Sequence, residues 1–402
     1  MKKKVVEEEE KSLTSEEKKL LKKLEKGELD LLDPSKGPIN EDPKYQVYTD
    51  MGYEVHPKEG LLYRDSETIS RQRKAILQLI KTLGSNILQG KSLMNISMPV
   101  TIFDKATMLQ RAAIDFTYAP IYMEEVYKTE DPVDKMKYVV AFYVAGLHLN
   151  LSQKKPFNPI WGETYQGRIG KDLDVYCEQI SHHPAITFAY LDAPHYNITA
   201  KHEYSLKIYP NSASFRCNGY RKIIMKDSAK TTYLIRYPWA ESKGFMFGLP
   251  AFSYNGDIVI KDKTNKIYAM LRLNAGKKTF AEGWFKKSNN RNDFFKGLIT
   301  KNKELLKDTS KKIFYSKEML SYIEGNWIDY VMIDGERYWE IDKQLPLPVT
   351  NLTDPLPSDS SYREDLKAFI ANNEEEAQKQ KEIMEEIQRN DRKLREKFVK
   401  KK

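Results

Sequence analysis

The sequence has few cysteines and no long apolar run, and each shortage excludes a class of protein. The two cysteines, Cys177 and Cys217, are too few for a disulfide scaffold and do not have the spacing of a zinc site. No run reaches the roughly 18 apolar residues needed to cross a bilayer. The lysines at the N-terminus precede glutamates rather than an apolar segment, so no secretory signal is indicated. We therefore predict a cytoplasmic protein in a reducing compartment.

Positive charge is in excess. The formal net charge is +9 over 402 residues, which favours anionic partners such as membrane surfaces, phosphates or nucleic acid. No zinc-finger spacing or nucleic-acid recognition motif is present, so we expect no nucleic-acid partner. The hydrophobic content of 40% is sufficient for a large core.

Short β segments dominate the middle of the chain. They recur from residue 164 to about residue 287, with turn signals such as Asn255-Gly256 between them and no helices interleaved. Further strands are expected at 327–333 and 338–341. This pattern predicts an α+β, mainly β fold: a meandering antiparallel sheet that curves into a barrel and can enclose a ligand cavity.

Helical patterns lie on both sides of this sheet. A capped, charged helix is expected at 14–26, and a proline-rich linker or surface strap at 33–60. Residues 70–88 have the spacing of a basic amphipathic helix, which is typical of a helix packed on its own domain, on a membrane or over a cavity. We expect further helices at 107–127 and 132–150. A last helix, capped by Ser361, is predicted to run to about residue 400, with its end in solvent.

The segment Glu178-Gln179-Ile180-Ser181-His182-His183-Pro184 places two of the six histidines side by side. Because the residue before a proline is pushed to an extended or turn backbone, a strand at 172–179 should deliver both imidazoles at its exit. Two adjacent histidines can hold a proton, a metal ion or an anion, or can be ordinary polar loop residues. The heptapeptide alone leaves these alternatives open. We do not expect Cys177 to be a nucleophile, because no third group orients it.

Two other patterns contain polar residues at suggestive positions. The loop at 154–163 has two prolines and a glycine, which indicates a rigid turn. Lys381, Glu385 and Arg389 are spaced four residues apart, so they share one face of the last predicted helix. An ordinary ladder of surface ion pairs has the same spacing.

These pieces together resemble the lipid-binding domain of the oxysterol-binding protein family. The resemblance rests on Lys155-Pro156-Phe157-Asn158-Pro159 with Gly162-Glu163, on the histidine-pair segment, and on the Lys381/Glu385/Arg389 face. Supporting matches are Met98-Pro99-Val100, Leu109-Gln110-Arg111 and the segment from Ser358 to Asp365. The resemblance covers roughly residues 70–389.

The resemblance implies a large incomplete antiparallel β-barrel around a hydrophobic tunnel, with an N-terminal helical lid and a C-terminal helical subdomain. We expect a charged N-terminal extension and linker at 1–68 and the lipid-binding domain at 69–402. Within that domain the lid is expected at about 70–89, the barrel at about 150–345 and the C-terminal helix at about 361–400. By motif match, the phosphoinositide headgroup would be held by Lys155, Asn158, His182, His183, Lys381, Glu385 and Arg389.

The implied activity is lipid transfer rather than catalysis. Family members carry lipids between membranes, many in exchange for phosphatidylinositol 4-phosphate, so the expected partners are this lipid, anionic membrane surfaces, and either sterol or phosphatidylserine. Sterol is favoured, and the protein is expected to be a monomer without a cofactor. We expect it in the cytoplasm, peripheral at membranes and membrane contact sites. Beside the anion, the histidines would donate as imidazolium.

Two positions depart from the family pattern near the expected mouth. Trp161 stands where an aliphatic residue is usual, and Ala185 replaces a second proline. Neither removes a headgroup ligand, but both can change the shape of the mouth.

Two other hypotheses belong to different classes. A lipid-dependent sensor or scaffold would signal its loaded state without bulk transfer. A metal-dependent hydrolase would use His182, His183 and a carboxylate such as Glu178, although adjacent histidines do not have the spacing of helical zinc ligands.

Overall fold

The computed structural model describes residues 42–57, 60–83, 97–209, 211–244, 246, 248–274, 293–308 and 310–399. The helix expected at 14–26 and the strand expected near 280–285 lie outside these residues. The end of the expected lid, residues 84–89, also lies outside them.

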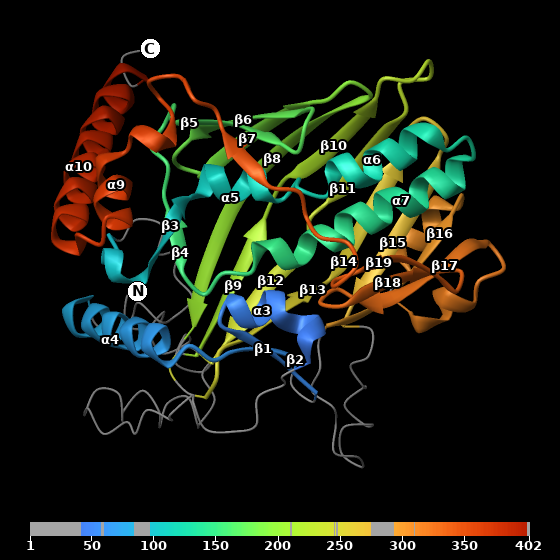
Figure 1. Cartoon of the computed structure of the whole chain (residues 1–402), viewed down its shortest axis with the longest axis horizontal. Helices are drawn as coiled ribbons and strands as arrows, with labels where there is room; N and C mark the ends of the chain where they lie inside the picture. Colours follow the sequence, from blue (N-terminus) through green and yellow to red (C-terminus); the bar gives the residue numbers. More distant parts are fainter. Residues whose placement is uncertain are drawn as a thin grey trace, which may run out of the picture.

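Eighteen of the described strands form one sheet, and every neighbouring pair in it is antiparallel (Figure 1). The long strand β8 (Tyr196–Tyr209) belongs to two branches, because its first half pairs with β7 and β10 and its second half pairs with β9. The strands are β1 (Tyr53–His56), β2 (Gly60–Tyr63), β5 (Thr164–Ile169), β6 (Leu173–Ser181), β7 (Ile186–Asp192), β8, β9 (Ser212–Cys217), β10 (Tyr220–Met225), β11 (Thr232–Arg236), β12 (Trp239–Lys243), β13 (Ala251–Asn255), β14 (Asp257–Asp262), β15 (Ile267–Leu273), β16 (Phe294–Thr300), β17 (Met319–Asn326), β18 (Tyr330–Ile333), β19 (Glu336–Glu340) and β20 (Val349–Asn351).

The sheet curves without closing. In the described part of the chain β19 pairs only with β18, and β20 pairs only with β5. The predicted incomplete antiparallel barrel is therefore confirmed. Two short strands outside it, β3 (Phe103–Thr107) and β4 (Lys155–Phe157), pair in parallel.

Alternating burial explains the strands that the sequence predicted. In β6, Leu173, Val175 and Cys177 are buried, whereas Tyr176 and Glu178 are exposed. This period of two places one set of side chains inside the curved sheet and the other outside. At the turn before β10, a Cβ on Gly219 would lie 1.9 Å from the Lys201 carbonyl oxygen, so only glycine fits this close approach between backbones.

Three helices and a 3₁₀ turn cover one face of the sheet (Figure 1). The helix expected at 107–127 is two helices, α5 (Met108–Ile114) and α6 (Ala119–Lys128), separated by a turn. Thr107 and Gln110 form a capping box at the start of α5. The helix expected at 132–150 is α7 (Pro132–Ala145) followed by the 3₁₀ helix η4 (Gly146–Asn150). Most of α7 is buried, because it packs between the sheet and α6.

The expectation of a linker or strap at 33–60 is wrong for the part that the structure describes. Residues 43–50 form η1 (Pro43–Tyr45) and α3 (Gln46–Asp50), β1 and β2 pair with one another as antiparallel strands, and β2 also pairs with β13. Tyr48 is fully buried, and its hydroxyl donates to the Ile328 carbonyl oxygen at 2.6 Å. Tyrosines and aliphatic residues of this segment, among them Tyr53, Val55 and Leu61, are buried in the core, so its prolines were misleading.

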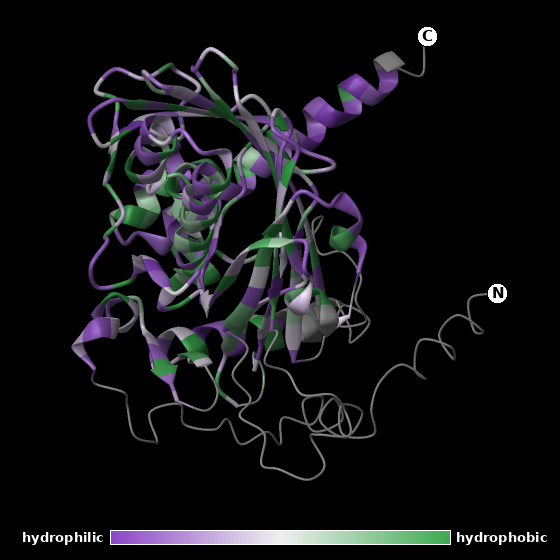
Figure 2. Cartoon of the chain, turned by 90° about the vertical axis from the view of Figure 1, so that its right-hand side faces the viewer, coloured by the Kyte–Doolittle hydropathy of each residue, from purple (hydrophilic) through white to green (hydrophobic). Residues whose placement is uncertain are grey.

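The C-terminal helix is also divided. A short 3₁₀ helix, η7 (Ser360–Tyr362), precedes α9 (Glu364–Ile370) and α10 (Glu374–Val399). The break needs no glycine or proline, because Asn372 adopts a φ of 59° and Asn373 accepts from the Glu376 N–H at the start of α10. The predicted cap at Ser361 is wrong, since Asp359 accepts from the Ser361 N–H instead. The last turns of α10 project from the body of the protein, as expected (Figure 2).

The remaining long helix is α4 (Ser66–Leu83), at the position of the expected lid. It begins about one turn before the predicted start at residue 70. Among the described residues no helix has the length and apolar character that a membrane span requires.

Candidate functional site: a cationic mouth on an apolar tunnel

One face of α10 carries the expected triad. The Nζ of Lys381 lies 2.6 Å from Glu385 Oε1, and Arg389 lies 3.8 Å from the second oxygen of the same carboxylate. Lys381 is almost fully buried and also donates to the Ser97 hydroxyl at 2.9 Å. The triad is therefore a positioned group rather than a ladder of fully solvated ion pairs.

The two histidines lie in the turn that follows β6, as the sequence predicted. Their ring centroids are 4.3 Å apart. Buried Gln179 supports the turn: its amide donates to the Ser181 carbonyl oxygen and its oxygen accepts from the Thr187 hydroxyl, both at 2.7 Å. The strand thus ends with both imidazoles held at one place.

Strand β4 and the loop after it add Lys155 and Asn158. The Lys155 Nζ donates to Asn158 Oδ1 at 2.6 Å. It also lies 4.6 Å from the centre of the Phe103 ring, while the Nζ of Lys381 lies 5.6 Å from that centre. One aromatic ring therefore supports two cations from distant parts of the sequence.

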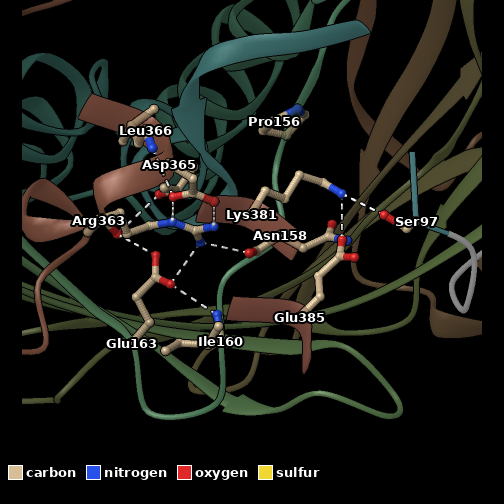
Figure 3. Close-up of polar contacts among 12 residues, drawn as sticks. Ser97, Pro156, Asn158, Ile160, Glu163, Arg363, Asp365, Leu366, Lys381 and Glu385 are labelled. Atoms are coloured by element: carbon tan, nitrogen blue, oxygen red, sulfur yellow. Dashed lines mark hydrogen bonds and ion pairs between the residues drawn. The ribbon is translucent and has the colours of Figure 1, made fainter. Parts of the chain in front are cut away.

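A buried ion network joins this loop to the C-terminal helices (Figure 3). The Arg363 guanidinium binds Asp365 with two hydrogen bonds and donates to Glu163 at 2.9 Å and to the Asn158 carbonyl oxygen at 2.7 Å. Glu163 in turn accepts from the Ile160 N–H at 3.0 Å. This bidentate geometry fixes the loop relative to α9 and, through α9, to α10.

These residues border two neighbouring cavities. A polar cavity of about 290 Å³, which we call the mouth, is lined by six of the seven predicted residues, Lys155 being the exception. A larger cavity of about 420 Å³, the tunnel, lies against Lys155 and shares Asn158, His182 and His183 with the mouth. The structure thus brings all seven predicted residues together at the junction of the two cavities.

Burial changes the protonation of the mouth. Burial, with Lys381 as a further cause, lowers the pKa of Lys155 to about 7. Burial and then the neighbouring His183 lower the pKa of His182 to about 4, and burial lowers that of His183 as well. In the ligand-free site the histidines are therefore neutral at pH 7. An anion would raise all three pKa values, so its binding would take up protons.

The tunnel has mainly apolar walls, and a group of buried polar residues lies among them. The apolar lining includes Leu147 of η4, Met98, and the strand residues Leu206, Ala240 and Phe252. The helix α4 contributes Gln72 and Ile76 to the lining, so it covers part of the tunnel; that it acts as a lid stays a prediction. This cover is anchored: Gln72 donates to the Gln153 carbonyl oxygen at 2.7 Å, and buried Arg73 donates to backbone carbonyls of Gly244 and Gly248.

The polar group, which we call the inner cluster, consists of Asp115, His202 and Arg221. The guanidinium of Arg221 lies 3.3 Å from Asp115 Oδ2 and 4.4 Å from the centre of the Phe116 ring. Both ring nitrogens of His202 and the second oxygen of Asp115 are buried without a hydrogen-bond partner within the protein. Burial raises the pKa of Asp115 to about 6 and lowers that of His202 to about 3.

A model of the family described as oxysterol-binding protein matches residues 78–402. The chain belongs to the oxysterol-binding protein family. Its relatives include oxysterol-binding protein 9 of Dictyostelium discoideum, with 30% identity over 84% of this chain and 79% of the relative. Another is the human oxysterol-binding protein-related protein 8, with 24% identity over 86% of this chain but only 38% of the relative.

Solved structures confirm the fold. The Osh1 ORD domain in complex with ergosterol aligns with a TM-score of 0.64 and 21% identity, over 96% of this chain and 90% of that one. The Osh3 ORD of Saccharomyces cerevisiae in complex with PI(4)P aligns with a TM-score of 0.61 and 19% identity, over 80% of this chain and 85% of that one.

Several residues that line the mouth and the tunnel were not predicted from the sequence. Arg392, one turn beyond Arg389, lines the mouth and contributes to the lowered pKa of His183. Its spacing on α10 was the signal that could have identified it. The inner cluster gave no signal, because Asp115, His202 and Arg221 come from three separate elements.

The alternative chemistries find no support in the described residues. Glu178 is exposed on the outer face of β6, and the described part of the chain contains no group of three histidine, cysteine or acidic residues able to hold a metal ion. Cys177 is buried, which raises the pKa of its thiol and disfavours the reactive thiolate.

Proposed function

We propose that this protein extracts phosphatidylinositol 4-phosphate from a membrane, with the headgroup in the mouth and the acyl chains in the tunnel. The observation that carries the proposal is the continuity of a cation-rich polar cavity with an apolar one at Asn158, His182 and His183. Such a site matches a lipid with a phosphorylated headgroup. The relative whose structure contains PI(4)P supports this ligand.

Each predicted residue has a role in this proposal. A phosphomonoester has three acceptor oxygens and between one and two negative charges near neutral pH. Lys381, Arg389 and protonated Lys155 supply charge, and Asn158 and the two histidines supply further donors. Glu385 holds Lys381 and Arg389 in position and is suited to accept from a ring hydroxyl. Arg392 is the additional cation that the structure brings to the mouth.

We further propose sterol as the second lipid, exchanged for the phosphoinositide between membranes. The inner cluster leaves donors and acceptors unpartnered in the wall of the tunnel. A sterol has one hydroxyl that can satisfy them, whereas the acyl chains of phosphatidylserine end in methyl groups. The Osh1 ORD complexes with ergosterol and cholesterol support this choice. Because both lipids would occupy the tunnel, they should exclude one another, as a carrier that exchanges one for the other requires.

Native mass spectrometry after incubation with mixed liposomes tests both parts of the proposal. The liposomes contain phosphatidylinositol 4-phosphate, sterol and phosphatidylserine. We expect one phosphoinositide or one sterol per protein, and we expect H182A/H183A to lose the phosphoinositide while keeping the sterol. The variant Y315A, at an exposed tyrosine outside both cavities, is the control.

Three outcomes would contradict the proposal. Phosphoinositide loading that survives in H182A/H183A would disprove the headgroup assignment. Loading with phosphatidylserine in place of sterol would disprove the second ligand. Loading of both lipids without transfer between liposomes would favour the sensor or scaffold hypothesis.

A further inference from the structure

A tryptophan is exposed beside the mouth. Trp161 is 47% exposed and lies in the turn whose preceding residue, Ile160, lines the mouth. The turn is not loose, because the Gly162 N–H donates to the Gln179 carbonyl oxygen at 2.9 Å. A large aromatic side chain is thus held partly in solvent next to the headgroup cavity.

The end of α10 lies against this tryptophan. The Arg395 guanidinium lies 3.8 Å from the centre of the Trp161 ring, a close cation–π contact. One turn earlier on the same helix, Arg392 lines the mouth. Arg392 lies 3.6 Å from Glu396, and both side chains are about half exposed, so solvent weakens that pair.

An apolar side chain extends the same region. Ile180 follows buried Gln179 in β6 and, by the alternation of the strand, faces outward, where it is 40% exposed. The hydrogen bond from Gly162 to Gln179 places the Trp161 turn beside it. We call Trp161, Ile180, Arg392 and Arg395 the mouth rim.

We propose that the mouth rim is a membrane-docking surface whose partner is an anionic phospholipid bilayer. This inference rests on the proposed function, because the headgroup must pass from a bilayer into the adjacent cavity. Tryptophan is enriched at membrane–water interfaces, where its ring lies at the depth of the headgroups. Arginines close to an anionic surface are attracted to it electrostatically. A rim of tryptophan, isoleucine and two arginines combines both contributions.

The arrangement also indicates how docking would proceed. In the free protein Arg395 covers one face of the indole ring. Lipid phosphates are stronger partners for a guanidinium than an aromatic ring is, so Arg395 would move to phosphate and release Trp161 into the interface. The border shared with a cationic cavity proposed for a lipid headgroup favours a phospholipid surface over an acidic peptide as the partner.

Sedimentation with vesicles tests the inference. The vesicles contain phosphatidylcholine with about 30% phosphatidylserine and no phosphoinositide, so the lipid proposed for the mouth is absent. We expect W161A/R395A to bind them about tenfold more weakly than the wild type, and we expect salt to weaken the wild type. The matched control is Y315A/K307A, which removes a tyrosine that is 85% exposed and a lysine whose side chain is 71% exposed, both outside the mouth rim. This control should bind as the wild type does.

A soluble ligand separates docking from headgroup binding. Dioctanoyl phosphatidylinositol 4-phosphate needs no membrane, so W161A/R395A should bind it normally while H182A/H183A should not. Unchanged vesicle binding by W161A/R395A would overturn the docking proposal. Loss of the soluble ligand in W161A/R395A would also overturn it, by making the rim part of the headgroup site. If the wild type does not bind the soluble lipid, while W161A/R395A binds vesicles more weakly than the wild type does, the headgroup assignment is refuted and the docking surface is supported.

Discussion

The mouth and the inner cluster both contain a guanidinium and a histidine, but they balance charge differently. In the mouth, Lys381 and Arg389 share one carboxylate, Glu385, and Arg392 adds a cation whose pair with Glu396 is weakened by solvent, so positive charge is in excess. In the inner cluster the one cation, Arg221, is matched by the one carboxylate, Asp115. Excess charge at an open cavity suits an anion, whereas balanced charge with unpartnered atoms suits a neutral polar group. Two sites made of similar residues are therefore suited to different ligands.

The substitution with the largest expected effect removes the charge balance of the inner cluster. Arg221→Met would leave Asp115 buried without its cation, so we expect the free energy of unfolding to fall by about 3 kcal/mol or more. Urea denaturation measures this loss. Adding Asp115→Asn removes the uncompensated carboxylate and should restore much of the stability. If the double variant is no more stable than Arg221→Met, the pair does not act as a balanced unit.

A smaller effect is expected in the pH dependence of phosphoinositide affinity, which tests the excess positive charge of the mouth. The pKa of Lys155 is about 7 in the free site and should rise when a phosphate binds. Binding therefore takes up a proton above pH 7, so affinity for dioctanoyl phosphatidylinositol 4-phosphate should fall up to about tenfold between pH 7 and 8. Below pH 7 this lysine is already charged, and its contribution to the pH dependence should disappear.

Lys155→Arg provides the control for this pH dependence. Arginine stays charged throughout this range, so the affinity of the variant should change less between pH 7 and 8, whatever its absolute value. Titration calorimetry in buffers of different ionisation enthalpy would also count the protons taken up. No proton uptake in the wild type at pH 8 would contradict the assignment of Lys155 as a headgroup ligand.

The smallest effect concerns the unpartnered histidine. His202→Phe keeps an aromatic ring against Phe116 and Tyr237 but removes both ring nitrogens. If a sterol hydroxyl bonds to His202, sterol affinity should fall about fivefold, the size of one neutral hydrogen bond. Phosphoinositide affinity should not change. A fluorescent sterol titration measures the first, and equal losses for both lipids would show that the ring acts only through packing.

The residues that meet at the junction of the two cavities were readable from the sequence because each group of them is local. His182 and His183 are adjacent, Lys155 and Asn158 are three positions apart, and Lys381 to Arg389 lie on about two turns of one helix. Local rules of strands, prolines and helices place such groups correctly. The resemblance to the family then connected the three groups.

The segments that the sequence analysis misjudged are those whose structure depends on distant contacts. Tyr48 is buried because Ile328, almost 300 residues away, accepts its hydroxyl hydrogen bond. The split of the C-terminal helix depends on Asn372 adopting a left-handed backbone, which composition does not reveal.

The sequence by itself therefore determined the class of fold, the helices and strands with regular periodicity, and the three local groups of polar residues, because these follow from short-range spacing. Only the tertiary structure decided that these groups meet at the junction of two cavities, that Arg363 ties the loop containing Asn158 and Glu163 to α9, and that Asp115, His202 and Arg221 face the same tunnel. The physical reason is that the fold brings together residues more than two hundred positions apart. Charge balance and burial, which set what each site can bind, exist only after that convergence.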